Sequence, residues 1–184
     1  MTTGSLNKMI SNLQELKEDI EQYAKETNQE VWFYPEYEGV KGFWGTQDII
    51  LLGLNPSSGI FPSNKDKLLY DLLKQKGFGN VHITDFIKVR AKNKHVTDFL
   101  ANSVLMKKQT DFFSKELNII KPKIIVTMGL QCNTLLKQYF PKIDCKYKVR
   151  NIKHYSFRYQ KREEVFAEIS ESLEEIKKEY ESCS

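Results

Sequence analysis

The 184-residue sequence has few cysteines and no long apolar run. Its three cysteines, Cys132, Cys145 and Cys183, form no Cys-x-x-Cys pair and no mixed Cys/His ligand spacing. We therefore expect neither a disulfide scaffold nor a zinc site, and interpret all three as inert thiols. No apolar run approaches the ~20 residues of a membrane span, and residues 1–7 lack a basic region followed by an apolar core. These absences predict a cytoplasmic protein that does not contact a membrane.

Glycine-rich loops that bind nucleotide phosphates are also missing, because no Gly-x-Gly-x-x-Gly or Walker-type segment occurs. We predict no cofactor and no metal ion. The length and the ordinary composition, with 40% hydrophobic and 28% charged residues, fit a single domain over residues 1–184. Within it we expect an N-terminal helix at 1–28, a motif-bearing core at 47–160 and a C-terminal helix at 163–181. We expect a monomer.

Positive charge is concentrated in the middle of the chain. Residues 121–162 contain eleven basic side chains and one acid, Asp144, and residues 65–94 contain eight basic side chains and three acids, whereas both ends of the chain are acidic. Such a block suits a polyanion, since neutralised phosphates release counterions. A solvated lysine-rich surface would produce the same pattern.

The most informative stretch is an apolar run, Ile49–Leu52, followed by Gly53–Gly59. The run predicts a strand buried on both faces, and the Gly/Asn/Pro/Ser cluster predicts a tight loop at its carboxyl end, where open α/β sheets bind ligands. Gly53 permits a close approach of the backbone, and the Asn55 amide can both donate and accept hydrogen bonds. Asn55 is the leading candidate for chemistry, although asparagine is also an ordinary turn residue.

Helical and strand patterns alternate along the rest of the chain. Helices are predicted at 6–26, with Ser5 as cap, and at 65–76, 97–118, 131–139 and 163–180; strands are predicted at 80–86, 123–128 and 147–152. Residues 88–95 read as a basic loop. The aromatic stretch 31–39 reads as an irregular lead-in whose rings either stack on a base or pack in the core. This alternation predicts a three-layer α/β/α fold with a mainly parallel sheet of about four strands.

Several segments together resemble the uracil-DNA glycosylase superfamily, most closely its branch of mismatch-specific uracil and thymine glycosylases. The similar segments, in order, are Gly53–Pro56, Phe61–Asn64, Gly77–Phe78, Ile83–Lys88, Lys121–Gly129 and His154–Ser156. The resemblance spans about Ile49 to Tyr159, and no single segment is specific on its own. It implies a monofunctional DNA N-glycosylase that acts on a uracil-like, mismatched or modified base flipped out of DNA, which we expect to be double-stranded.

The resemblance also implies roles for individual residues. Asn55 would position the attacking water, and His154 would donate to the base carbonyl oxygen, so these two are the expected catalytic residues. The residues expected to bind the base are Gly53, Leu54, Pro56, Ser57, Phe61, Thr84 and Asp85. Those expected to bind DNA are Lys153, Ser156, Phe157, Arg158 and Tyr159, with Ser156 on a phosphate and the last three inserted into the duplex.

Other interpretations stay open at this point. Phe61 also fits a core position and His154 also fits a structural or surface histidine, while His82 and His95 are expected to be uninvolved. A non-catalytic nucleic-acid-binding protein on the same fold would keep the basic surface without the chemistry. A nucleotide-binding or sugar-phosphate-binding α/β enzyme would share the strand, loop and helix.

Overall fold

The computed structural model describes residues 3–56, 59–90 and 100–182. Its centre is a four-stranded parallel sheet with the strand order β3-β2-β5-β6. The strands are β2 (Ile49–Gly53), β3 (His82–Asp85), β5 (Ile124–Met128) and β6 (Lys148–Ile152). The predicted α/β class and the predicted parallel sheet of about four strands are confirmed.

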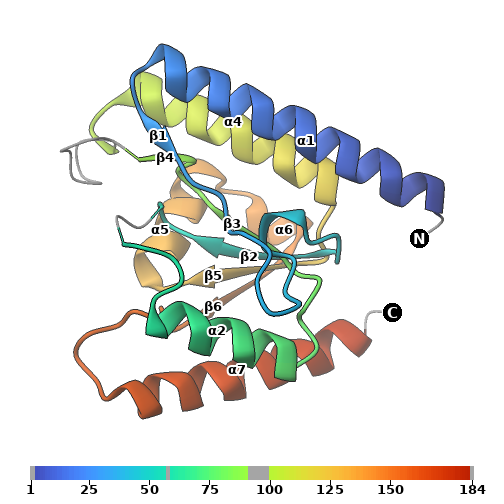
Figure 1. Cartoon of the computed structure of the whole chain (residues 1–184), viewed down its shortest axis with the longest axis vertical. Helices are drawn as coiled ribbons and strands as arrows, with labels where there is room; N and C mark the ends of the chain where they lie inside the picture. The colour runs from blue at the N-terminus through green and yellow to red at the C-terminus, as the bar shows by residue number, and fades with distance from the viewer. Residues whose placement is uncertain (1–2, 57–58, 91–99, 183–184) are drawn as a thin grey trace.

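Helices cover both faces of this sheet (Figure 1). One face carries α1 (Thr3–Glu26), α4 (Ser103–Ile120), α5 (Leu130–Tyr139) and the short α6 (Ile143–Lys146). The other face carries α2 (Asn64–Gln75) and α7 (Arg162–Ser182), which lie side by side. The fold is therefore a three-layer α/β/α arrangement.

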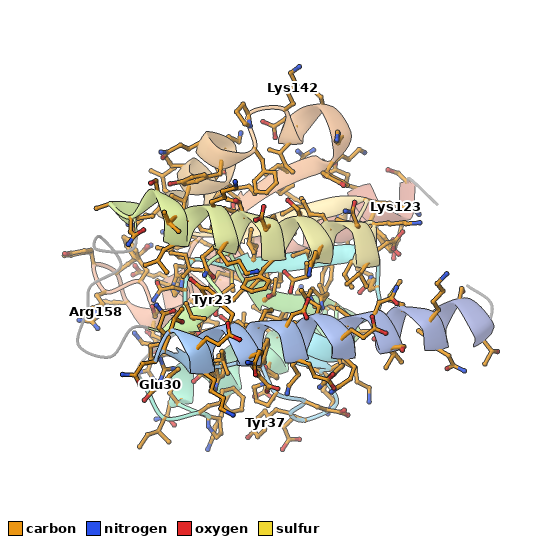
Figure 2. The ribbon with its side chains drawn as sticks, turned by 90° about the horizontal axis from the view of Figure 1, so that it is seen from above. Tyr23, Glu30, Tyr37, Lys123, Lys142 and Arg158 are labelled. Carbon is orange, nitrogen blue, oxygen red and sulfur yellow. The ribbon has the colours of Figure 1, made fainter. Side chains whose placement is uncertain are left out.

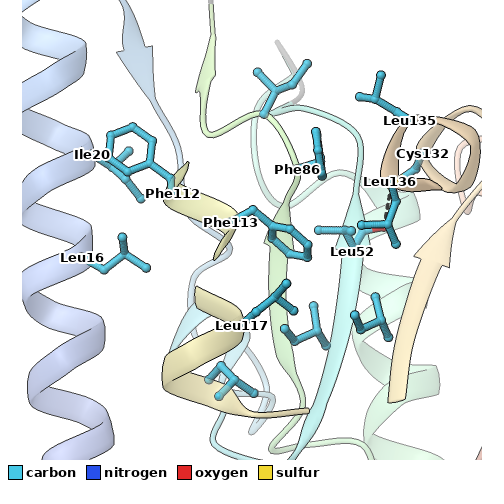
Figure 3. Close-up of a cluster of buried hydrophobic side chains, with 14 of the residues drawn as sticks. Leu16, Ile20, Leu52, Phe86, Phe112, Phe113, Leu117, Cys132, Leu135 and Leu136 are labelled. Carbon is cyan, nitrogen blue, oxygen red and sulfur yellow. Dashed lines mark hydrogen bonds between the residues drawn. The ribbon is translucent and has the colours of Figure 1, made fainter. Parts of the chain in front are cut away.

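Two apolar cores sandwich the sheet, as the alternation along β2 shows. Ile50 and Leu52 pack into the core beneath α1, α4 and α5, where Figure 3 shows Leu52 near Phe86, Phe113 and Leu136. Ile49 and Leu51 pack against the α2 and α7 side. Successive side chains of a strand point to opposite faces, so a continuous apolar run is what a strand covered on both sides requires.

The first two helices begin slightly earlier than the sequence predicts. Ser5 lies inside α1, which already includes Thr3, so its prediction as the helix cap is wrong. For α2, the Ser63 side chain accepts from the backbone of Asp66, and the Asp66 carboxylate accepts from the backbone of Ser63. With this reciprocal capping box at Ser63, α2 begins at Asn64, one residue before the predicted start at Lys65. Gly77, with φ of 84°, follows the C-cap residue Lys76, so α2 ends close to the predicted residue 76.

A small antiparallel ribbon replaces part of the predicted basic loop at 88–95. β4 (Val89–Arg90) pairs with β1 (Glu30–Val31), and a 3-10 turn, η1 (Gly42–Trp44), follows the aromatic stretch. Lys88, expected in that loop, is only 3% exposed, because its ammonium group is bound by carboxylate and hydroxyl oxygens inside the fold. Residues 91–95 lie outside the described part of the chain.

Among the helices of the described residues, none combines the length and the apolarity that crossing a bilayer requires.

Candidate functional site

The parallel register brings the predicted loops to one edge of the sheet. Gly53 at the end of β2 lies opposite Asp85 at the end of β3, and Gly129 donates its N–H to Ile152 at the end of β6. The segments that follow these strand ends enclose a pocket of about 310 Å³, within the range of small-ligand sites. Its lining residues are Trp32, Tyr34, Asn55, Gly59, Ile60, Phe61, Ser63, Lys65, Asp66, Asp85, His154, Tyr155 and Ser156.

A larger hollow of about 520 Å³ runs along α4 and α6. Its lining is mostly apolar or aromatic, with Lys142 and Lys146 as its charged residues, and contains neither a carboxyl nor an imidazole group. The smaller pocket contains acids, an amide, a histidine and a lysine together. We therefore take the smaller pocket as the candidate site.

Asp85 is a deeply buried acid of this pocket. It is 4% exposed, and neither carboxyl oxygen makes a hydrogen bond of ordinary geometry among the described residues, although the Tyr34 hydroxyl lies close enough to act on the carboxyl group. Burial raises the pKa of Asp85 to about 7; Lys88 and the Tyr34 hydroxyl oppose that rise, and Glu116 adds to it. A buried acid whose pKa lies near neutrality is typical of a working group rather than a structural one.

The predicted loop after β2 is only partly in the pocket. Asn55 lines it, and its Nδ2 donates to the carbonyl of Pro56 over 3.2 Å, which leaves Oδ1 able to accept a hydrogen bond. Pro56 is buried, and the carbonyl of the half-buried Leu54 accepts from the N–H of Ile87. Ser57 lies outside the described residues.

Gly53 makes room for the acid rather than for a ligand in this structure. A Cβ at that position would lie 2.2 Å from Oδ1 of Asp85 and 3.2 Å from the Tyr34 hydroxyl oxygen. Any larger residue would displace the carboxyl from its present place. The close approach expected at Gly53 is thus made by Asp85 itself.

Aromatic rings form one wall of the pocket. Phe61 lies 5.8 Å from Trp32, centroid to centroid, and Trp32 lies 4.6 Å from Tyr34. Phe61 also contacts Tyr37 and Tyr70 edge-on, so it is at once packed and pocket-lining. Trp32 and Tyr34 were not expected among the site residues, although the aromatic stretch 31–39 was the signal that could have identified them. A planar ring entering the pocket would meet aromatic side chains on this side.

His154 is held as a neutral donor. Its Nδ1 accepts from the backbone N–H of Ser156 over 3.1 Å, and the Ser156 hydroxyl lies 2.8 Å from the same atom. Because a backbone N–H can only donate, the neutral imidazole carries its proton on Nε2. Burial, and then the charge of Lys65, lower the pKa of His154. Tyr155 stacks on the imidazole at 4.9 Å and is buried, which fixes the ring plane.

Thr84 is not brought to this pocket. It precedes Asp85 by one residue, so it points to the opposite face of β3. There its hydroxyl donates to Oε1 of Glu116 over 2.9 Å and accepts from Lys88 over 2.8 Å. His82, on the same face, lies 3.2 Å from Glu116. This buried quartet lies behind the site and is separate from its lining.

The segment after His154 is exposed. Phe157 and Tyr159 contact each other edge-on at 5.7 Å, and Tyr159 is 93% exposed. Figure 2 shows Arg158 at the end of the molecule opposite Lys123. Since Lys123 precedes β5 and Arg158 follows β6, this is the end that carries the pocket. Three of the five residues predicted to contact DNA, Phe157, Arg158 and Tyr159, thus lie on the surface beside it.

The basic segment at residues 121–162, here called the basic block, is less one-sided in space than in sequence. Five of its side chains pair with carboxylates, three of them with acids of α7: Lys123 with Asp48, Lys137 with Asp144, Lys148 and Arg150 with Glu179, and Lys153 with Glu168. Lys153 also donates to Gln160. Lys65 lines the pocket itself, and Arg158, Lys161 and Arg162, which follow β6 in the chain, are exposed.

Gly129 lies against the side chain of His154, so a larger residue at this position should disturb the histidine. Its φ is +92°, and a Cβ would lie 3.2 Å from that of His154. We expect Gly129→Ala to lower the free energy of unfolding by about 1–2 kcal/mol and to shift the His154 ring signals in an NMR spectrum. The control is Gly4→Ala in α1, where a Cβ meets nothing within 4 Å; urea unfolding compares the two. Equal stability of both variants would contradict this role.

The thiols and acids show no metal-binding arrangement. Cys132 is buried and donates to the carbonyl oxygens of Leu52 and Gly53, Cys145 is exposed, and Cys183 lies outside the described residues. Among the described residues, no group of three or more His, Cys, Asp or Glu side chains could hold a metal ion.

Comparison with protein-family models and with curated proteins found no match.

Proposed function

We propose that the chain is a monofunctional DNA N-glycosylase that hydrolyses the N-glycosidic bond of a uracil-like, mismatched or modified base flipped out of DNA. The observation that carries the proposal is the pocket itself, which gathers Asn55, Phe61, Asp85, His154 and Ser156 at one sheet edge. Excision of a base requires a pocket for a single planar ring with polar groups at its edge. The sequence resemblance to uracil-DNA glycosylases is consistent with this arrangement.

Each lining group has a chemical task in this proposal. The Asn55 Oδ1 accepts from a water molecule and orients it toward C1′ of the sugar. Because an amide is not a strong base, the rate gain comes from orientation and from stabilising the charge that develops on the departing base. The Nε2–H of His154 donates to a base carbonyl oxygen, and Phe61 with Trp32 stacks on the ring. Phe157 and Tyr159 would enter the duplex where the base has left.

The first test is base release by Asn55→Ala under single-turnover conditions. End-labelled duplexes would carry uracil or thymine opposite guanine, uracil opposite adenine, hypoxanthine, or a hydroxymethylated pyrimidine. We expect the variant to lose about 10²–10³-fold in rate, as for removal of one positioned polar group, while salt-dependent DNA binding stays unchanged. Asn7→Ala, exposed in α1, is the matched control and should keep the wild-type rate.

Two results would contradict the proposal. Release by Asn55→Ala at the wild-type rate would remove Asn55 from the mechanism. DNA binding without release of any base by the wild type would favour the non-catalytic binding protein on the same fold. Binding of mononucleotides in preference to short oligonucleotides would favour the nucleotide-binding enzyme.

A further inference from the structure

The unpaired carboxyl group of Asp85 carries information about the ligand. Both of its oxygens are buried and neither makes a hydrogen bond of ordinary geometry among the described residues; the nearby Tyr34 hydroxyl has one proton and could satisfy only one of them. The side chain lines the pocket. Leaving a buried polar group unsatisfied is costly in a folded protein, and native structures rarely do so without a functional reason. A ligand that brings hydrogen-bonding groups to Asp85 would satisfy it.

The neighbouring charged groups are engaged elsewhere. Lys88 binds Glu116 and Thr84, and Arg90 pairs with Glu30 at 3.8 Å. Six titratable groups interact electrostatically with Asp85. They are Tyr34, Lys88, Arg90, Glu116, Cys132 and Tyr155. The two cations offset part of the cost of ionising Asp85, but their ammonium and guanidinium groups are held by other acids.

We propose that Asp85 selects bases with an amidine edge, in which a ring nitrogen acceptor stands next to an exocyclic amino group, as in cytosine and adenine. The inference rests on the proposed glycosylase function and narrows its substrate. A protonated carboxyl group presents one donor and one acceptor side by side. The donor meets the ring nitrogen and the acceptor meets the amino group, which gives two parallel hydrogen bonds.

An oxo base offers a weaker match. The imide edge of uracil can also form two hydrogen bonds with a protonated acid, but its oxygen is a much weaker base than the ring nitrogen of an amidine. The proton of Asp85 can shift toward that ring nitrogen, so the amidine pair gains charge assistance, and such hydrogen bonds are roughly twice as strong as neutral ones. If Asp85 were ionised, one of its oxygens would lie against the carbonyl oxygen of the imide, and the lone pairs of these two acceptors would repel each other.

The same proton balances the release step. As the bond between C1′ and the base breaks, its electron pair stays on the base, and Asp85 gives its proton to the ring nitrogen. A neutral base departs and Asp85 becomes a carboxylate. The oxygen of the water held by Asn55 adds to C1′, and the proton it loses returns to Asp85 through solvent. No oxidant, reductant or further reactant is needed.

The test uses two pairs of free bases that differ only in an amino or an oxo group: cytosine with uracil, and adenine with hypoxanthine. Binding to the full chain is measured by titration calorimetry at mildly acidic pH, with wild type, Asp85→Asn and the control Asp71→Asn, an exposed acid of α2. We expect the wild type and the control to bind the amino member about tenfold more tightly. In Asp85→Asn the ratio should fall close to one. Comparison of the two pairs tells pyrimidine from purine.

A parallel assay of single-turnover release, from duplexes that carry the amino as well as the oxo base of each pair, separates this inference from the proposed function. Amino-base preference in binding without release of any base would overturn the glycosylase function and leave the assignment of Asp85 standing. Release of uracil by the wild type, together with equal binding of both members of each pair, would overturn the assignment of Asp85 and leave the glycosylase function standing. If neither member of a pair binds up to its solubility limit, the assignment of Asp85 is overturned.

Discussion

Replacement of Asp85 by asparagine is expected to stabilise the protein, and to do so only above acidic pH. Burial raises the pKa of this carboxyl from 3.8 to about 7 in the folded chain, which at 1.36 kcal/mol per pH unit corresponds to ~4 kcal/mol. Asparagine has nearly the same shape and carries no charge at any pH. The variant therefore removes the cost of ionising a buried acid.

The sign of this stability difference follows from the number of protons that the folded and the unfolded chain bind. Below about pH 4 the carboxyl is protonated in both the folded and the unfolded chain, so wild type and Asp85→Asn should be equally stable. Between about pH 4 and 7 the unfolded chain loses the proton while the folded chain keeps it, and the wild type becomes progressively less stable. Above about pH 7 the difference stays constant, at up to ~4 kcal/mol.

Urea unfolding of the two proteins at about pH 4, 6 and 8 measures this difference directly, since other titrating groups are common to both. Asp71→Asn should show no such pH dependence. A stability difference that is constant with pH would mean that Asp85 is not the perturbed acid. Stability gained by removing a pocket residue is the usual sign that the residue is kept for function.

The sequence was sufficient to predict the sheet edge because its signal is local. Ile49–Leu52 and the cluster after it define a buried strand and its loop, and parallel strands place their carboxyl ends together. Asn55 and Asp85 were therefore expected at one edge of the sheet, and the resemblance to uracil-DNA glycosylases added Phe61 and His154 to them. The same reasoning could have separated Thr84 from Asp85, because adjacent residues of a strand face opposite sides.

Other features depend on partners that are far away in sequence. Trp32 and Tyr34 reach the pocket because β1 pairs with β4, and a two-residue strand leaves almost no periodic signal. The basic block is partly neutralised by Glu168 and Glu179 of α7. Charge counted along a sequence cannot reveal such pairs, because only the tertiary fold places those acids beside the lysines.

The buried quartet behind the site gives the prediction with the largest expected loss of stability. Lys88 is 2% exposed at its side chain and Glu116 is fully buried; their ion pair is completed by Thr84 and His82. Burial alone would raise the pKa of Glu116, but Lys88 and then His82 lower it below its ordinary value. Lys88→Met would leave this carboxyl group buried and without its main partner, so it would have to stay charged at a cost or take up a proton.

We expect Lys88→Met to lower the free energy of unfolding by about 3–5 kcal/mol, the range for breaking one side of a buried pair. Lys115→Met, one position before Glu116 on α4, is the matched control, since Lys115 pairs with Asp19 at an exposed site and should cost less than ~1 kcal/mol. Urea unfolding at neutral pH compares the two variants. Equal losses would mean that the buried pair contributes no more than a surface pair.

The double variant Lys88→Met/Glu116→Gln distinguishes a charge effect from lost packing. If the penalty comes from the uncompensated carboxylate, neutralising Glu116 should recover part of the stability lost in Lys88→Met; if it comes from packing, the losses should add. The comparison also concerns the pocket, because Lys88 is the main charge that opposes the raised pKa of Asp85. Loss of Lys88 would keep Asp85 protonated to higher pH, so the quartet supports both the fold and the protonation state on which base selection rests.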